Sequence, residues 1–157
     1  MRTGTHIVAP LVLVLALAGC AVAKDSFSDS KAGYVSDARA AAADWTQASI
    51  VTVTVLDYEF QPPQLNFEAG KAYRLRLQNN SKHTHFFAAE EFFKSIVAEK
   101  LIEDGGTIDH PLLKAIALGG GESKELLFVP VNEGIYNLKC TAPFHEAFGM
   151  TGTITIS

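Results

Sequence analysis

The sequence has little of what several classes of protein require. It contains no long basic run, and 13 Lys and Arg against 17 Asp and Glu give a net charge of −4, which argues against nucleic-acid binding. No apolar stretch reaches the roughly 20 residues that a membrane-spanning helix needs. Only two cysteines are present, and neither belongs to a Cys-x-x-Cys-His motif, which excludes covalently attached haem. With 157 residues, the chain has room for one domain.

The first 20 residues are typical of an export signal. Arg2 is followed by 13 uncharged, mostly apolar residues, Ile7 to Gly19, and then by Cys20. Leu17-Ala18-Gly19-Cys20 resembles a bacterial lipobox, which implies cleavage before Cys20 and lipidation of that residue. We therefore expect a signal peptide at 1–19 and an exported protein, lipid-anchored in the bacterial envelope and facing the periplasm or the cell exterior, on the outer membrane if the cell is Gram-negative. The alternative is an ordinary secretory signal in which Cys20 is incidental.

The mature chain would hold a single cysteine available for chemistry and a single methionine. These are Cys140 and Met150. In an oxidising compartment Cys140 has no partner for an intramolecular disulfide. Such a thiol is expected to be buried, bound to metal or catalytic, and an inert buried thiol is the simplest reading because free cysteine is among the most buried residue types.

The rest of the chain divides into a tether and one domain. Residues 20–47 are rich in Ala, Ser, Asp and Lys, so we expect a lipid-anchored flexible tether there, and the folded domain at 48–157. Apolar residues alternate with polar ones over short runs, which predicts strands, and 90–97 has the spacing of one short helix. The predicted strands are 50–56, 64–67, 71–78, 83–87, 113–118, 126–129, 135–140 and 150–156. The predicted fold class is all-β, an antiparallel β-sandwich of seven or eight strands.

The last two predicted strands bring unusual side chains together. Cys140 ends one strand and Met150 begins the next, and both are expected to point inward. The loop between them contains His145, and a second imidazole, from His83 or His85, could arrive from another strand end. A thiolate, two imidazoles and a weak thioether are the ligands of a trigonal electron-transfer copper site, whereas methionine is a poor ligand for zinc.

Two motifs in this domain resemble those of the cupredoxins. Cys140-Thr141-Ala142-Pro143-Phe144-His145, followed by Met150, is similar to the ligand loop of that family. Asn79-Asn80, followed by His85, is similar to the plastocyanin pattern for the distant histidine. The resemblance implies a Greek-key sandwich that binds one copper ion, with His85, Cys140 and His145 as equatorial ligands and Met150 as the axial ligand. His83 is a possible alternative ligand, because it lies on the same strand face as His85.

The sequence departs from the family pattern in three places. Phe144 stands where glycine usually precedes the loop histidine. Phe86 stands where asparagine commonly follows the first histidine, so a side-chain brace between the ligand loops is expected to be missing. The stretch from Glu99 to Pro111 is longer than in plastocyanins. These differences bear on the spectral class and the reduction potential.

The resemblance implies a monomeric electron carrier rather than an enzyme. Single electrons would pass through the edge of His145 to or from a redox protein such as a c-type cytochrome, an oxidase or a reductase. An apolar docking patch is expected around it, formed by Ala142, Pro143, Phe144, Ala147 and Phe148. The alternatives are a periplasmic copper carrier, for which one methionine is few, and an open copper site that binds a small molecule. A Cys-His hydrolase would need an accessible thiolate, and a binuclear copper centre would need a second cysteine in the loop.

Overall fold

The computed structural model describes residues 34–35, 38 and 42–157. The predicted signal peptide, 1–19, and much of the predicted tether, 20–47, lie outside the described residues, so the predicted domain boundaries stay predictions. Among the residues that are described, no helix has the length and the apolar character needed to cross a membrane.

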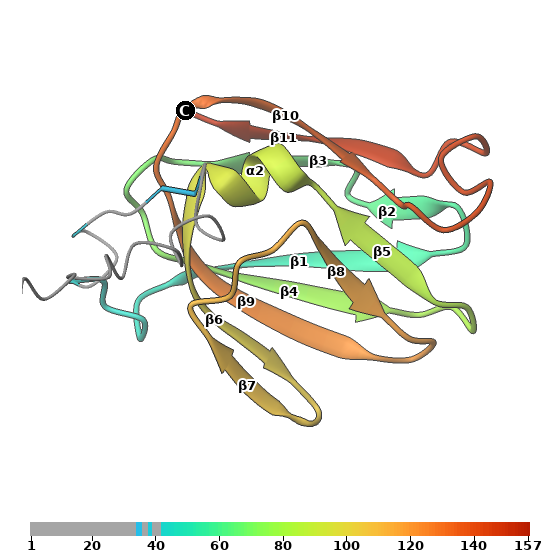
Figure 1. Cartoon of the computed structure of the whole chain (residues 1–157), viewed down its shortest axis with the longest axis horizontal. Helices are drawn as coiled ribbons and strands as arrows, with labels where there is room; N and C mark the ends of the chain where they lie inside the picture. The colour runs from blue at the N-terminus through green and yellow to red at the C-terminus, as the bar shows by residue number, and fades with distance from the viewer. Residues whose placement is uncertain (1–33, 36–37, 39–41) are drawn as a thin grey trace, which may run out of the picture. The chain divides into compact units, whose positions relative to one another are not determined.

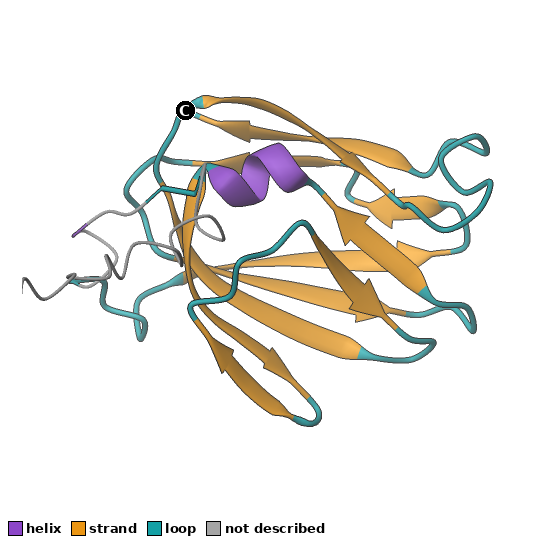
Figure 2. Cartoon of the chain, viewed as in Figure 1, coloured by secondary structure: helices purple, strands orange, loops and turns teal. Residues whose placement is uncertain are grey.

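The domain is a sandwich of two sheets with one short helix, α2 (Glu90–Lys94) (Figures 1 and 2). The first sheet has six strands in the order β2 (Glu59–Gln61), β1 (Ser49–Leu56), β4 (Tyr73–Asn79), β9 (Ser123–Pro130), β6 (Ile96–Glu103) and β7 (Gly106–Asp109). The second has five, in the order β3 (Gln64–Phe67), β11 (Thr151–Ile156), β10 (Gly134–Lys139), β5 (His85–Ala88) and β8 (Ala115–Leu118).

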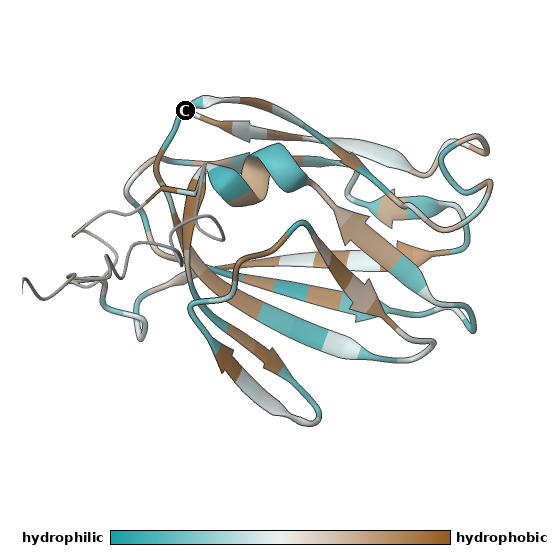
Figure 3. Ribbon diagram, viewed as in Figure 1, coloured by the Kyte–Doolittle hydropathy of each residue, from teal (hydrophilic) through white to brown (hydrophobic). Residues whose placement is uncertain are grey.

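The core lies between the sheets and follows from the alternation in the sequence. In β4, Tyr73, Leu75 and Leu77 are buried, while the arginines between them are partly exposed. Figure 3 shows the same alternation of apolar and polar residues along this strand. Side chains of this size each gain about 1.5–3 kcal/mol when they leave water. Aromatic rings fill the end of the core next to α2, where Phe92 and Tyr73 both pack against Phe128.

The predicted β-sandwich with one short helix is confirmed, and the structure adds detail that the sequence pattern did not give. The sheets are mixed, because β1 pairs with β4 and β11 with β3 in parallel. The helix ends at Lys94 rather than at Val97, since Ile96 and Val97 pair with β9 as the start of β6. The long stretch from Glu99 to Pro111 contains most of β6 and all of β7, which form a hairpin.

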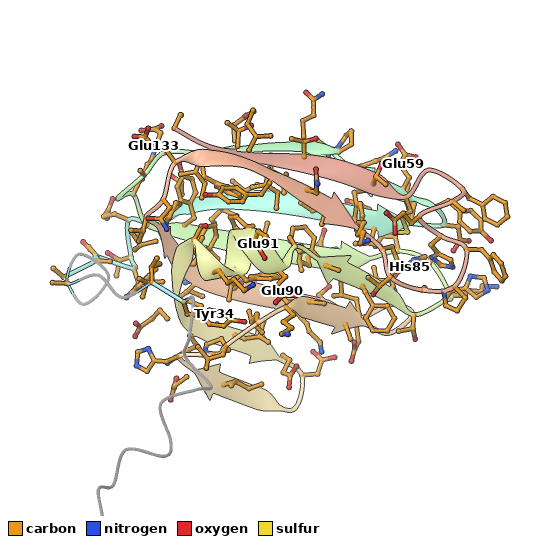
Figure 4. The ribbon with its side chains drawn as sticks, turned by 45° about the horizontal axis from the view of Figure 1, so that its top comes forward. Tyr34, Glu59, His85, Glu90, Glu91 and Glu133 are labelled. Atoms are coloured by element: carbon orange, nitrogen blue, oxygen red, sulfur yellow. The ribbon has the colours of Figure 1, made fainter. Side chains whose placement is uncertain are left out.

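Two residues of the predicted tether bond to the domain. The Tyr34 hydroxyl donates a hydrogen bond to the Leu113 carbonyl oxygen at 2.7 Å, and its ring packs against the core. The Val35 N–H donates to the Lys94 carbonyl oxygen at 3.2 Å. Figure 4 shows Tyr34 and His85 at opposite ends of the domain. This attachment therefore lies far from the residues described next.

Candidate metal centre

Three side chains predicted as ligands meet at one end of the sandwich. The Cys140 Sγ lies 3.8 Å from the His85 Nδ1 and 3.5 Å from the His145 Nδ1, and the two nitrogens are 3.2 Å apart. No other group of three His, Cys, Asp or Glu side chains within the described part of the chain comes together in this way. His85 and Cys140 are fully buried, and His145 is partly exposed.

The triangle of donor atoms has the size that a metal ion requires. A point equidistant from the three atoms lies about 2 Å from each, which is the length of a metal–nitrogen bond and slightly less than that of a metal–sulfur bond. One thiolate and two imidazoles in a trigonal arrangement suit copper in both of its oxidation states. The size of the triangle and the types of its donor atoms therefore fit one copper ion.

The local structure of the two strand ends explains why the donors converge. His85 is the first residue of β5, and Cys140 directly follows β10, which pairs with β5. The loop between β10 and β11 folds back on itself, since the Met150 N–H donates to the His145 carbonyl oxygen at 2.9 Å. The Cys140 N–H donates to the Met150 carbonyl oxygen at 3.0 Å, which closes the loop.

Met150 lies beside the donor residues in the closed loop. Its backbone is bonded to both Cys140 and His145, and its side chain is completely buried. Its assignment as a ligand stays a prediction. His83 lies outside the triangle: its side chain is 71% exposed, and its Nδ1 lies 3.0 Å from the Asp57 Oδ1.

The Cys140 sulfur also accepts a hydrogen bond. The backbone N–H of Phe86 donates to the Sγ at 3.4 Å, so the residue after His85 contacts the sulfur although it is not asparagine. An N–H group that donates a hydrogen bond to a thiolate stabilises the negative charge of the sulfur. The sulfur then donates less electron density to a bound metal. This contact ties β5 to the end of β10 without a side-chain brace.

A different side-chain brace comes from Asn79, in the segment that leads to His85. This residue is buried, and its side-chain amide donates to the carbonyl oxygens of His83, Leu118 and Gly119 at 2.8, 3.0 and 2.8 Å. Its side-chain oxygen accepts from the Ser81 N–H at 3.0 Å. Asn79 therefore fixes the loop that leads to His85 against the turn after β8. A Cβ on Gly120 in that turn would lie 2.6 Å from the Lys82 carbonyl oxygen, so the close approach requires glycine.

The environment of His85 keeps its imidazole neutral. Burial lowers the pKa of His85, and the neighbouring His145 lowers it further, while Asp57 acts in the opposite direction. The Asp57 carboxylate can only accept a hydrogen bond, so it favours the neutral tautomer with the proton on Nε2, which leaves the lone pair on Nδ1, the atom that faces Cys140. The other ring nitrogen, Nε2, lies 2.9 Å from the Ser81 Oγ and 3.4 Å from the Asp57 Oδ1.

Two further residues contact the site, Asp57 and Tyr58 in the turn between β1 and β2, and neither was predicted from the sequence. The pKa of Asp57 is lowered, chiefly by its hydrogen bond with His83, so the carboxylate is ionised at neutral pH. The Tyr58 ring packs edge-on against His145, with 4.9 Å between ring centroids. Neither residue belongs to a motif, and a break between two strands was their only signal in the sequence.

The predicted docking patch is exposed to solvent. Phe144 and Phe148 are 76% and 65% exposed, Pro143 and Ala147 are exposed, and Ala142 is partly buried. Tyr58 adjoins this patch, since its ring centroid lies 5.3 Å from that of Phe148. Exposed apolar side chains therefore lie in the same loop as His145, and the Tyr58 ring links His145 to Phe148.

Comparisons with known proteins are consistent with this geometry. The sequence profile described as "Copper binding proteins, plastocyanin/azurin family" matches residues 48–157. Similar folds include reduced auracyanin from Roseiflexus castenholzii (18% identity, TM-score 0.51, 70% of this chain and 98% of that one). They also include a multicopper oxidase from Pseudomonas thermotolerans (18% identity, TM-score 0.58, 73% of this chain and 31% of that one). The chain thus spans about a third of the oxidase. No curated protein matches the chain.

Proposed function

Since the chain belongs to the plastocyanin/azurin family of copper-binding proteins, we propose that this cupredoxin carries single electrons between redox partners. It is a blue-copper protein with one copper ion per chain. The observation that supports electron transfer best is the enclosure of the site. Its thiol and one imidazole have no exposed surface, and the other imidazole is the only one of the three donors that reaches the surface.

This enclosure favours a carrier over a catalyst. Bound copper would supply the one-electron exchange between Cu(II) and Cu(I). The chain holds the three donors in place through bonds to backbone groups, so the same cage serves both oxidation states with little movement. A substrate would need an open position at the metal, and the side chains of His85, Cys140 and Met150 have no exposed surface.

The exposed apolar surface around His145 supports a transient docking role. Phe144, Phe148 and Tyr58 give a partner a surface that is small and apolar, which suits brief contacts between redox proteins. The partner class we propose is a c-type cytochrome, an oxidase or a reductase. We further propose that the protein works as a monomer, attached to a membrane of the bacterial envelope through Cys20.

The first test is a visible and EPR spectrum of the chain loaded with Cu(II). We expect an intense thiolate-to-copper charge-transfer band and a narrow copper hyperfine splitting. Replacing Cys140→Ser removes the thiolate and should abolish both features. A matched pair tests the histidines: His85→Gly should lose the band and His83→Gly should keep it, because only His85 contacts the other donors.

Other outcomes would favour the alternative functions. Copper that binds without the band, or that oxidises Cys140, would favour a copper carrier or an open copper site that binds a small molecule. A chain that binds no copper would contradict the ligand assignment.

A further inference from the structure

The turn between β1 and β2 contacts both histidines of the metal centre. Its two residues are consecutive, and each reaches a different ring. The Asp57 Oδ1 lies 3.4 Å from the His85 Nε2, and the Tyr58 ring packs edge-on against the His145 ring at 4.9 Å.

Asp57 lies where it can change the ligand strength of His85. The Nε2 faces Asp57 and Ser81, while the Nδ1 faces the other donors. When the Nδ1 binds a metal, the Nε2 carries the proton and donates it in a hydrogen bond. A carboxylate beside that N–H makes the imidazole a stronger donor and fixes its orientation. The turn thereby supplies a negative charge that a serine hydroxyl alone would not.

His83 holds the carboxylate in this position. Its Nδ1 lies 3.0 Å from the same oxygen of Asp57, and its backbone N–H donates to the Ser81 Oγ at 3.1 Å. Ser81 is in turn 2.9 Å from the His85 Nε2. Two side chains from two segments, Asp57 and Ser81, therefore meet at the outer nitrogen of His85, and His83 is bonded to both of them. His83 therefore supports the site through Asp57 and Ser81 and is not itself one of the three donors.

Tyr58 restricts the other histidine. The ring is 46% exposed and contacts both His145 and Phe148 edge-on. Its backbone is left-handed, with φ of 64°, a conformation that is uncommon for a large side chain. Unfavourable backbone conformations persist where surrounding contacts compensate for them. The edge-on contacts with His145 and Phe148 are the contacts of this kind that the Tyr58 ring makes.

We infer that Asp57 and Tyr58 are positioning residues that hold the two histidine ligands from outside, with Asp57 lowering the reduction potential and Tyr58 slowing the loss of copper. Asp57 stabilises Cu(II) more than Cu(I), because a stronger imidazole donor favours the higher charge. Tyr58 blocks the movement by which His145 would leave the metal. The inference rests on the proposed copper site and deepens it.

The test for Asp57 compares two acidic residues of the same region. Asp57→Asn removes the charge beside His85 and keeps the size of the side chain. Glu59→Gln removes an equal charge two residues away, from an exposed side chain whose hydrogen-bond partner is Gln61 rather than a histidine. We expect Asp57→Asn to raise the reduction potential and to weaken Cu(II) binding by about 10-fold or more, while Glu59→Gln changes neither appreciably. Equal shifts in the two variants would overturn the inference for Asp57.

The test for Tyr58 separates the ring from the backbone conformation. Tyr58→Asn removes the ring, and asparagine tolerates the left-handed backbone well. Tyr58→Phe keeps the ring edge that faces His145. We expect Tyr58→Asn to lose Cu(I) to a chelator about 2- to 10-fold faster than the native chain, and Tyr58→Phe to match the native rate. Identical rates for Tyr58→Asn and Tyr58→Phe would exclude a role for the ring.

The spectrum of the native chain distinguishes a failure of the proposed copper site from a failure of the positioning role of Asp57 and Tyr58. If the native chain lacks the charge-transfer band, the proposed copper site fails. If the band is present in the native chain and in all four variants, but the potentials and loss rates do not change, the site stands and the positioning role fails.

Discussion

Among the single residues of the site, exposure differs sharply. His85, Cys140 and Met150 have no contact with solvent, whereas His145 is partly exposed. The two histidines therefore do different work in the proposed function: His85 completes a rigid cage, and His145 also connects it with the surface. Substitutions at the buried positions should alter the metal's properties, and substitutions around His145 should alter partner exchange.

Met150 provides the first prediction at this scale. Met150→Gln replaces the weak thioether with a harder oxygen donor, which favours Cu(II), so we expect a lower reduction potential. Met150→Leu keeps an apolar side chain of similar volume but has no donor, so we expect a higher potential. A redox titration that follows the visible band measures both. If the two variants shift the potential in the same direction, Met150 is not an axial ligand.

At the scale of elements, the paired strands β4 and β9 share a cluster of one acidic and two basic side chains. Glu125 on β9 accepts hydrogen bonds from Arg74 and Arg76 on β4, each at 2.8 Å. Burial raises the pKa of Glu125, but the two hydrogen bonds outweigh this effect, and the net pKa lies below its usual value. The ionised carboxylate therefore stabilises the folded state and joins the two strands that pair at the centre of the first sheet.

The sign of this shift gives a prediction for stability against pH. Because the folded-state pKa is lowered, the stabilisation is present above the ordinary glutamate pKa of about 4.3 and is lost as the pH falls through the folded-state value. Glu125→Gln should lower the free energy of unfolding by about 0.5–1 kcal/mol at pH 7. The difference should vanish at low pH in denaturant titrations. Glu68→Gln, which removes an exposed pair with Lys71, is the control and should have little effect. A deficit in Glu125→Gln that does not shrink as the pH is lowered would exclude the charge of the carboxylate as its cause.

The sequence predicts strands well where one face of the strand is buried. It predicts them poorly where pairing with a distant strand determines whether a segment becomes a strand or a helix. Alternation marked the strands around Val53 and Leu75 because each has one buried face. Ile96 and Val97 fitted a helix by spacing, yet pairing with β9 makes them a strand. The hairpin of β6 and β7 was missed because the residues of β7 are all exposed and have no core pattern.

The same division applies to the metal centre. The motif around Cys140 and His145 could be recognised because its donors are close in sequence. Asp57 and Tyr58 could not, since they reach the site from another part of the chain and only the folding of the sheets brings them there. Asn79 was recognised from the sequence only as part of the motif that precedes His85. Its bracing role could not be predicted, because two of its partners are backbone groups 39 and 40 residues away.

At the scale of the whole molecule, the proposed partner surface can be tested without altering the copper. Phe148 is exposed and contacts the Tyr58 ring rather than a donor atom. Phe148→Glu should slow electron exchange with the physiological partner, because it places a charge within an apolar contact. The visible spectrum should not change. Stopped-flow kinetics measure the rate, and Ile135→Glu is the control, since Ile135 is 77% exposed on β10, outside the proposed patch. Equal rates for the two variants would remove the patch from the proposal.

The bond between Tyr34 and Leu113 sets a limit on how far the domain can travel. If Cys20 carries the proposed lipid, the chain from Cys20 to Tyr34 spans at most about 50 Å even when fully extended, whereas the chain from Cys20 to Ser49 would span about 100 Å. The bond from Tyr34 therefore halves the maximum length of the tether between the lipid and the domain. Tyr34 lies at the opposite end of the domain from His85 (Figure 4), so with the proposed anchor the copper end would point away from the membrane. Partners in a shallow layer beside the membrane would be met often, and those beyond it would not be met at all.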